Sequence, residues 1–169
     1  GNYPENHGII SNTMYDSEWN AEYYIGENSE PVSESRWYEA EPIWVTAEKQ
    51  GLITATYFWP GSDAEINGNR PTYWYQYDGS VPNQNRVQQV LNWLDLSKNN
   101  RPNFITLYFS DADSWGHTYG PESDGINDIV RELDGHIGTL IEGLENRNLL
   151  DEVNIILTSD HGMTGLSRD

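Results

Sequence analysis

Apolar residues recur at intervals of three and four along residues 124–146, and this spacing predicts a long amphipathic helix. The same spacing predicts a second helix over residues 83–96. A shorter helix is expected over residues 41–51, because Pro42 suits its first turn and Gly51 suits its C-terminal end. The chain is therefore expected to carry several helices separated by other elements.

Runs of β-branched, aromatic and other apolar residues alternate with these helices. Such runs at residues 52–59, 103–109 and 153–158 predict strands. Near-continuous apolar strands that alternate with helices are typical of a parallel sheet that is buried on both sides. The predicted fold class is therefore α/β, with a mainly parallel sheet and helices on both faces. Composition favours loops over residues 60–71 and 110–123.

Residues 11–40 follow neither a helical nor a strand period. They are polar and irregular, with scattered tyrosine and tryptophan residues. We interpret this stretch as a long, irregular surface excursion whose aromatic rings are held against the rest of the protein.

Carboxylate and imidazole side chains follow two of the predicted strands. Asp113 and His117 are four residues apart after the second strand, and Asp160 and His161 are adjacent after the third. Each pair taken alone is also consistent with a capped loop. The C-terminal ends of parallel strands meet at one edge of a sheet, where ligands gather. Zinc accepts both donor types, and two metals held together suit phosphoryl transfer, so the pairs favour a binuclear site.

Aromatic residues offer a second kind of site. Four aromatic rings crowd residues 70–79, which read as a loop, while Trp59 and Tyr108 stand near strand ends. Core packing explains most of these rings, but Trp59 and Tyr108 are the best candidates for stacking on a nucleobase.

Composition narrows the chemistry. The formal net charge is −18, from 27 acidic against 9 basic residues, which disfavours nucleic-acid duplexes and anionic membrane surfaces as partners. There is no cysteine, so disulfides, zinc thiolates and a cysteine nucleophile are excluded. No run approaches the roughly 20 apolar residues of a membrane span. No serine or threonine stands out as a nucleophile.

Seven segments, spread over almost the whole chain, carry a recognisable pattern: YPENHGII (3–10), EPIWVTAEKQG (41–51), TYFWPGSDAEING (56–68), YDGSVP (77–82), PNFITLYF (102–109), DSWGHTYGP (113–121) and SDHGM (159–163). In these segments and in their order, the chain resembles the ectonucleotide pyrophosphatase/phosphodiesterase family of the alkaline phosphatase superfamily. The resemblance implies part of an alkaline-phosphatase-like core. Family members cleave phosphodiester or pyrophosphate bonds through a covalent nucleotidyl-threonine, usually releasing a nucleoside 5′-monophosphate.

The same resemblance implies roles for the candidate metal ligands. Asp113 and His117 would bind one zinc ion, and Asp160 and His161 would bind the other, although another divalent metal is open. One departure is Trp115, which stands where the family usually has a small residue and is expected to lie beside the metals.

A nucleotide pocket is implied as well. By the resemblance, Trp59, Asp63, Tyr77 and Tyr108 fall where the family shapes this pocket. The implied substrate is a small nucleotide.

Residues 1–169 are expected to be the central part of a single phosphodiesterase catalytic domain. The nucleophilic threonine and the remaining metal ligands would then lie outside this chain, and the protein would be extracellular or periplasmic. Two alternatives are a choline-phosphoester or lysophospholipid phosphodiesterase of the same family and a non-catalytic metal-binding fragment. Sequence gives no indication of the oligomeric state.

Overall fold

A computed structural model describes residues 2–26 and 29–166. The chain forms two compact units. The first contains the residues up to Val81 together with Asn92–Tyr108, and the second contains Pro82–Leu91 and the residues from Phe109 onward. Each unit is described by itself.

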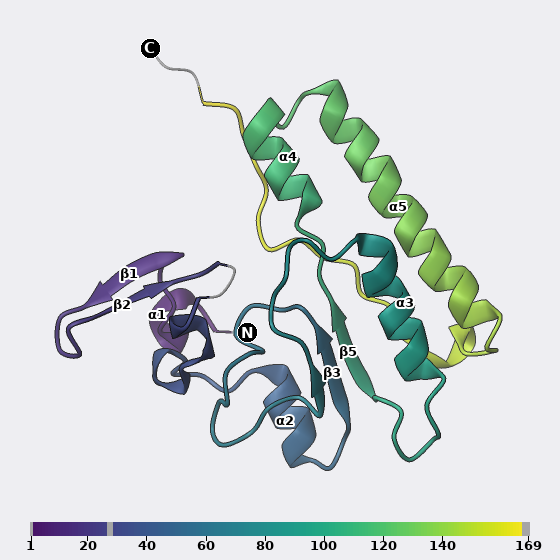
Figure 1. The fold of residues 1–169 in the computed structure, drawn as a ribbon, viewed down its shortest axis with the longest axis horizontal. Helices are drawn as coiled ribbons and strands as arrows, with labels where there is room; N and C mark the ends of the chain where they lie inside the picture. The colour runs from purple at the N-terminus through teal and green to yellow at the C-terminus, as the bar shows by residue number, and fades with distance from the viewer. Residues whose placement is uncertain (1, 27–28, 167–169) are drawn as a thin grey trace. The chain divides into compact units, whose positions relative to one another are not determined.

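The first unit is built on a three-stranded parallel sheet with the order β4-β3-β5 (Figure 1). Its strands are β3 (Thr54–Tyr57), β4 (Tyr73–Trp74) and β5 (Phe104–Leu107). All four residues of β3 are buried, as expected for a central strand. The predicted parallel sheet is confirmed, although β3 and β5 are shorter than their apolar runs. The short strand β4 corrects the loop that was expected over residues 70–79.

Helices contact the central strand on opposite faces. On one face, Glu48 of helix α2 (Ile43–Lys49) hydrogen bonds to the Thr54 hydroxyl at 2.7 Å. On the other face, the Tyr57 ring lies 5.9 Å from that of Trp93, near the end of helix α3 (Asn83–Leu94). Side chains three positions apart along a strand point to opposite faces. The predicted α/β class, with helices on both faces, is therefore confirmed.

A single carboxylate oxygen joins three segments of this unit. Oε1 of Glu48 accepts hydrogen bonds from the backbone N–H and the hydroxyl of Thr54, at 2.8 and 2.7 Å. It also accepts from the backbone N–H and the hydroxyl of Thr72, both at 2.8 Å. Glu48 thereby fixes the start of β3 and the residue before β4 relative to the end of α2.

Residues 11–40 are more ordered than their composition suggested. They contain an antiparallel hairpin of β1 (Thr13–Asp16) and β2 (Ala21–Tyr24) and two 3-10 turns, η1 (Pro31–Ser33) and η2 (Ser35–Trp37), after a short helix α1 (Pro4–His7). Tyr23 and Trp37 are buried, with ring centroids 5.5 Å apart. The segment is therefore more regular than predicted, and its buried rings form an apolar cluster.

The second unit contains α4 (Asp111–Tyr119), α5 (Asp124–Glu145), the 3-10 turn η3 (Leu150–Glu152) and the first part of α3. Helix α5 is confirmed within the range predicted from its apolar spacing. Helices α4 and α5 follow one another in Figure 1, where both are green. Helix α4 replaces the loop expected over residues 110–123. Acidic residues in its first turn and His117 in its last turn complement the helix dipole, a signal that glycine and serine content obscured.

The strand predicted over residues 153–158 does not form. In the part of the chain that the structure describes, no strand pairs with this segment, and Ile156 and Leu157 are 86% and 78% exposed. An apolar run indicates a tendency to be buried, but a strand also needs a neighbour for its backbone hydrogen bonds.

No helix within residues 2–26 and 29–166 has the length and apolar character needed to cross a membrane.

Removing the Glu48 acceptor is expected to destabilise the first unit. Glu48→Ala leaves Thr54, which is fully buried, without its partner, so the free energy of unfolding should fall by about 2–4 kcal/mol. Glu48→Gln keeps an acceptor but loses the charge, and should cost about 1–2 kcal/mol. Chemical denaturation measures both changes, with Glu65→Gln at an exposed site as the control.

The effect of Glu48→Gln should also depend on pH. Burial raises the pKa of Glu48, but the hydrogen bonds from Thr54 and Thr72 together lower it by more than burial raises it. The pKa of Glu48 therefore lies below the ordinary 4.5. A carboxyl group with a lowered folded pKa stabilises the protein above its unfolded pKa and loses this effect as pH falls through the folded value. The difference between parent and variant should therefore be full at pH 7 and shrink below about pH 4.5. A difference that grew on acidification would contradict this account.

Candidate metal and nucleotide sites

Helix α4 brings two of the predicted metal ligands onto one face. Asp113 and His117 are one helical turn apart, and Nε2 of His117 lies 3.4 Å from Oδ1 of Asp113. The start of the helix is held by Asn83, whose amide donates to Asp111 at 2.9 Å. A regular helix, rather than a loop that folds back, therefore provides this pairing.

The segment that carries Asp160 and His161 lies beside the same helix face. Nε2 of His161 is 3.9 Å from Oδ1 of Asp113 and 3.6 Å from Oδ2 of Asp160. The structure thus brings all four predicted metal ligands together within the second unit. Gly162 follows this pair, but its φ is not positive, so the chain there does not require glycine.

A close contact sets the distance between this segment and α4. A Cβ atom at Gly116 would lie only 2.5 Å from Sδ of Met163, so the methionine occupies space that any larger residue would fill. Gly116 and Met163 are positioning residues that the sequence reasoning missed. The signal was a glycine between Asp113 and His117 in what proves to be a helix, where glycine is otherwise unfavourable.

Local hydrogen bonds orient the His161 ring. Its Nδ1 lies 3.0 Å from the Gly162 carbonyl, and because a carbonyl only accepts, Nδ1 carries the hydrogen. The lone pair of Nε2 is then directed toward the two carboxylates, which is the usual state of a metal-binding imidazole. The bond to Gly162 raises the pKa of His161, and Asp160 and Asp113 act in the same direction.

The environment of Asp113 and the spacing of the two pairs suit the binding of a cation. Among the residues that the structure describes, its Oδ1 is buried and has no hydrogen-bond partner. Two ligands of one tetrahedral zinc lie roughly 3.3–3.5 Å apart, which agrees with the 3.4 Å between Asp113 and His117. The 3.6 Å between Asp160 and His161 is close to the same value. The donor types and spacings therefore suit one cation for each pair.

These pairs do not amount to complete metal sites. Within residues 2–26 and 29–166, no group of three or more His, Cys, Asp or Glu side chains is arranged to hold a metal ion. Zinc normally takes about three protein ligands or more. The pairs can contribute ligands to two ions but cannot enclose them alone.

The predicted nucleotide residues lie in the first unit, and two of them share one turn. Trp59 is half-buried and packs against an apolar cluster that contains Trp44 and Val45 of α2. Asp63 is only 6% exposed, and the backbone N–H of Tyr77 hydrogen bonds to its carboxyl group. Burial raises the pKa of Asp63, while that hydrogen bond and the charge of Arg70 oppose the rise.

Aromatic contacts connect the other two nucleotide residues. The Tyr77 ring lies 5.2 Å from that of Phe58 and 6.2 Å from that of Tyr108, in both cases edge to face. Together with the Asp63 hydrogen bond, these contacts gather Trp59, Asp63, Tyr77 and Tyr108 around the C-terminal ends of β3 and β5. This is the edge at which ligands bind in parallel sheets.

Trp115 does not lie beside the candidate metal ligands. It is two residues from Asp113 in a helix, which places it on the opposite side of α4. Its ring centroid lies 4.8 Å from that of Tyr119, and a Cβ atom at Gly125 would lie 3.5 Å from the same ring. The expectation that Trp115 borders the metals is therefore wrong, because that expectation assumed a loop at this position.

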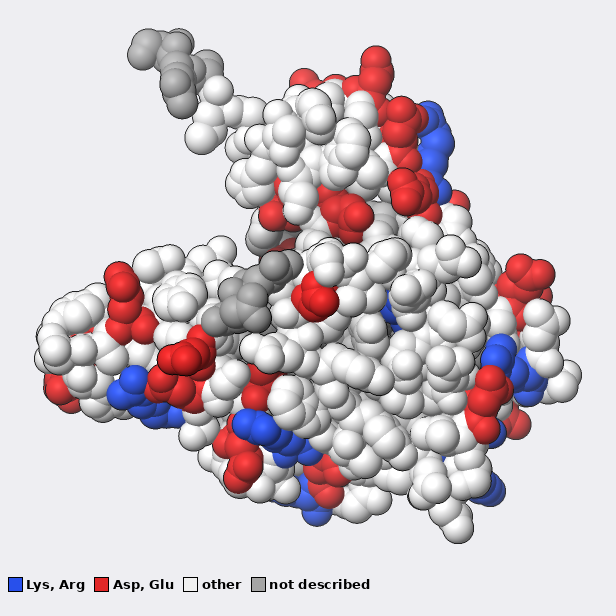
Figure 2. Space-filling view, in the orientation of Figure 1, with Lys and Arg blue, Asp and Glu red and all other residues white. Residues whose placement is uncertain are grey.

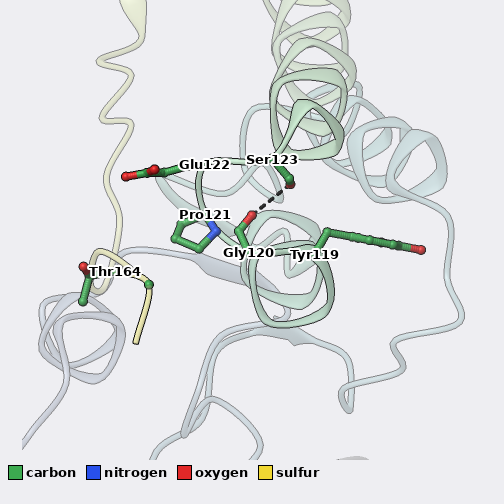
Figure 3. A pocket seen from close by; sticks show the side chains of 7 residues that line it. Tyr119, Gly120, Pro121, Glu122, Ser123 and Thr164 are labelled. Atoms are coloured by element: carbon green, nitrogen blue, oxygen red, sulfur yellow. Dashed lines mark hydrogen bonds between the residues drawn. The ribbon is translucent and has the colours of Figure 1, made fainter. Parts of the chain in front are cut away.

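A shallow hollow of about 500 Å³ lies next to α4 (Figure 3). It is lined by Tyr119–Ser123, Thr164 and Gly165. Figure 3 shows the Ser123 hydroxyl bonded to the Gly120 carbonyl, at 2.9 Å, and Tyr119 projecting away from Glu122 and Thr164. The residues that line this hollow include no lysine or arginine and none of the eight predicted site residues, so it is not the candidate site.

The chain is thus an α/β protein with two carboxylate–imidazole pairs in one unit and a cluster of aromatic residues with a buried aspartate in the other. The family described as type I phosphodiesterase/nucleotide pyrophosphatase matches residues 1–169. The chain belongs to this family.

Individual relatives support the assignment. Human ectonucleotide pyrophosphatase/phosphodiesterase family member 1 is 50% identical over 163 residues, covering 96% of this chain and 17% of that protein. The venom phosphodiesterase CdcPDE of Crotalus durissus collilineatus is 48% identical over 169 residues, covering 100% and 20%. This chain therefore spans about a fifth of the length of the curated relatives that it matches.

Solved structures show the same fold. Murine ectonucleotide pyrophosphatase/phosphodiesterase 5 matches with a TM-score of 0.89 and 34% identity, covering 98% of this chain and 43% of that one. An inactive variant of that murine protein in complex with AMP matches with a TM-score of 0.80 and 31% identity, covering 88% and 39%.

A methyl group at position 116 should disturb the contact between α4 and Met163. Alanine favours a helix over glycine by about 1 kcal/mol, but a methyl group at Gly116 requires the end of the flexible Met163 side chain to move, so Gly116→Ala should raise the free energy of unfolding by less than this amount or lower it slightly. Gly138→Ala in α5 is the matched control, since its Cβ would meet no described atom within 4 Å, and it should stabilise the protein. Chemical denaturation compares the two. Equal stabilisation by Gly116→Ala and Gly138→Ala would show that the Met163 side chain moves away at no cost in stability.

Proposed function

We propose that this chain is the central part of a single catalytic domain of a metal-dependent nucleotide pyrophosphatase/phosphodiesterase. The enzyme would hydrolyse phosphodiester or pyrophosphate bonds of small nucleotides and release nucleoside 5′-monophosphates. The attacking threonine, which would form a covalent nucleotidyl intermediate, and the remaining metal ligands would come from outside residues 1–169. The observation that carries the proposal is the buried Oδ1 of Asp113, which has no hydrogen-bond partner among the described residues and lies next to Nε2 of both His117 and His161.

The second unit would supply part of two zinc sites. Asp113 and His117 would hold one ion, and Asp160 and His161 the other, with another divalent metal as the alternative. Bound zinc supplies a Lewis acid that polarises a phosphoryl oxygen. The protein would hold the four metal-binding side chains at fixed distances from one another, through the turn of α4 and the Gly116–Met163 contact.

The first unit would recognise the nucleoside. Trp59, Tyr77 and Tyr108 offer ring faces for stacking on a base, and Asp63 ties the Trp59 turn to Tyr77. The AMP held by the murine relative supports a nucleotide as the ligand of this family.

The partner would be a small molecule rather than a nucleic-acid duplex. The net charge of −18 would repel a polyanion, and Figure 2 shows acidic residues in red scattered over much of the visible face, with fewer basic residues in blue. We place the protein outside the cytoplasm, extracellular or periplasmic, because one of its relatives is a venom phosphodiesterase.

Loss of a metal-binding side chain should abolish hydrolysis by the intact protein. Asp113→Asn and His161→Ala should each lower the zinc content toward one ion per protein and lower the rate on nitrophenyl thymidylate by about 100-fold or more, because even outer-shell partners of a metal change its affinity or the activity by about 10–100-fold. His136→Ala is the control, since His136 lies in α5 apart from the pairs. Elemental analysis and a colorimetric assay give the two readouts. Full activity in Asp113→Asn would refute the metal assignment.

Substrate choice separates the proposed function from its alternatives. The intact protein should hydrolyse nitrophenyl thymidylate much faster than nitrophenylphosphorylcholine, and chelation should stop the reaction. A preference for the choline ester would indicate a phospholipid-cleaving relative instead. Zinc binding without hydrolysis of either ester would indicate a non-catalytic metal-binding protein.

A further inference from the structure

Two residues outside the proposed substrate contacts flank the turn that carries Trp59 and Asp63. We propose that Tyr38 and Phe58 are positioning residues, which hold residues 59–63 in the conformation that receives the base of a nucleotide. This inference rests on the proposed function. It concerns recognition of the base rather than the hydrolytic step.

Phe58 immediately follows β3 and has an unusual backbone conformation. Its φ is 51°, in the left-handed region that bulky residues rarely adopt. Its side chain is 2% exposed, with ring centroids 4.6 Å from Tyr57 and 5.2 Å from Tyr77. Such a conformation persists only where the surroundings enforce it, and it tends to occur at functional sites. The buried ring thereby enforces the sharp change of direction after which Trp59 leaves the sheet.

Tyr38 supports the same turn from another side. Gly61 has a φ of 83°, and a Cβ atom there would lie only 2.9 Å from Cε1 of Tyr38. The tyrosine ring therefore lies directly against the backbone between Trp59 and Asp63. Tyr38 also packs with Trp59 against one apolar cluster. The turn cannot move toward this side without displacing the ring.

Hydrogen bonds hold the Tyr38 ring in place. Its hydroxyl donates to the Val32 carbonyl at 2.8 Å and lies 3.4 Å from the hydroxyl of Tyr23, which is 1% exposed. Burial raises the pKa of Tyr38, so the hydroxyl remains a donor. The hairpin and the 3-10 turns of residues 11–40 thus support the turn of the proposed nucleotide site.

A shift of the turn would change two stacking surfaces together. Trp59 belongs to the turn, and the Asp63 carboxyl group accepts a hydrogen bond from the backbone of Tyr77. Holding such groups in the bound conformation before the ligand arrives lowers the entropic cost of binding. Loss of Tyr38 or Phe58 should therefore weaken binding of a base while sparing the phosphodiester chemistry.

The test compares two substrates of the intact protein, nitrophenyl thymidylate and bis(nitrophenyl) phosphate, which has no base. Tyr38→Ala should raise KM for the thymidylate by roughly tenfold or more and leave kcat/KM for the base-free ester within about twofold. Phe58→Leu should give the same pattern. Tyr38→Phe keeps the ring against Gly61 but loses the hydrogen bond to Val32, so it should fall between the parent and Tyr38→Ala. Tyr15→Ala, at an exposed tyrosine of the hairpin, is the matched control.

The outcomes separate this inference from the proposed function. A parent protein that hydrolyses neither ester would refute the proposed function, and the inference with it. An active parent whose Tyr38→Ala variant loses both esters equally, or neither, would overturn the positioning role alone. If Tyr38→Ala does not fold, Tyr38→Leu replaces it, with circular dichroism to verify folding and calorimetric titration with AMP to measure base binding directly. Unchanged AMP affinity in a folded variant would also overturn the inference.

Discussion

The first unit depends on one carboxylate oxygen. Parallel strands need long connections, and the chain between β3 and β4 runs from residue 58 to residue 72, so the connection alone leaves the strand register open. Oε1 of Glu48 accepts hydrogen bonds from Thr54, which begins β3, and from Thr72, which precedes β4, and thereby fixes the alignment of the two strands at the end farthest from the proposed site. Trp59 and Tyr77 follow the C-terminal ends of these two strands, so their positions depend on that alignment. A residue with no contact to the ligand thus has a direct effect on the geometry of the site.

The second unit reaches its geometry through close packing rather than through a sheet. The i, i+4 spacing of α4 sets the first pair of donors, and the absence of a side chain at Gly116 lets Met163 approach, so that His161 faces Asp113. Oδ1 of Asp113 has no hydrogen-bond partner within the described residues, and Nε2 of His117 and of His161 lie 3.4 and 3.9 Å from it. Packing and electrostatics therefore both favour the metal site that we propose.

Periodicity and residue chemistry predicted much of this protein, and their failures have physical causes. The apolar spacing of α5 and the β-branched run of β3 identified both elements, because both patterns reflect burial. Helix α4 was missed because glycine and serine content outweighed the charges at its ends. The pairing of Asp113 with His117 followed from ligand types, whereas the backbone of Phe58 could not be predicted, since only tertiary packing holds it there.

The packing of Met163 against Gly116 also makes the position of His161 relative to Asp113 sensitive to oxidants. Oxidation turns the thioether of methionine into a polar sulfoxide with one more oxygen atom. Sδ of Met163 lies over Gly116, only 2.5 Å from the point where a Cβ atom would be, so oxidation would place a polar group at the contact between α4 and the segment that carries His161. Such damage would loosen this contact while leaving every metal-binding atom chemically intact, and methionine sulfoxide reductase would reverse it.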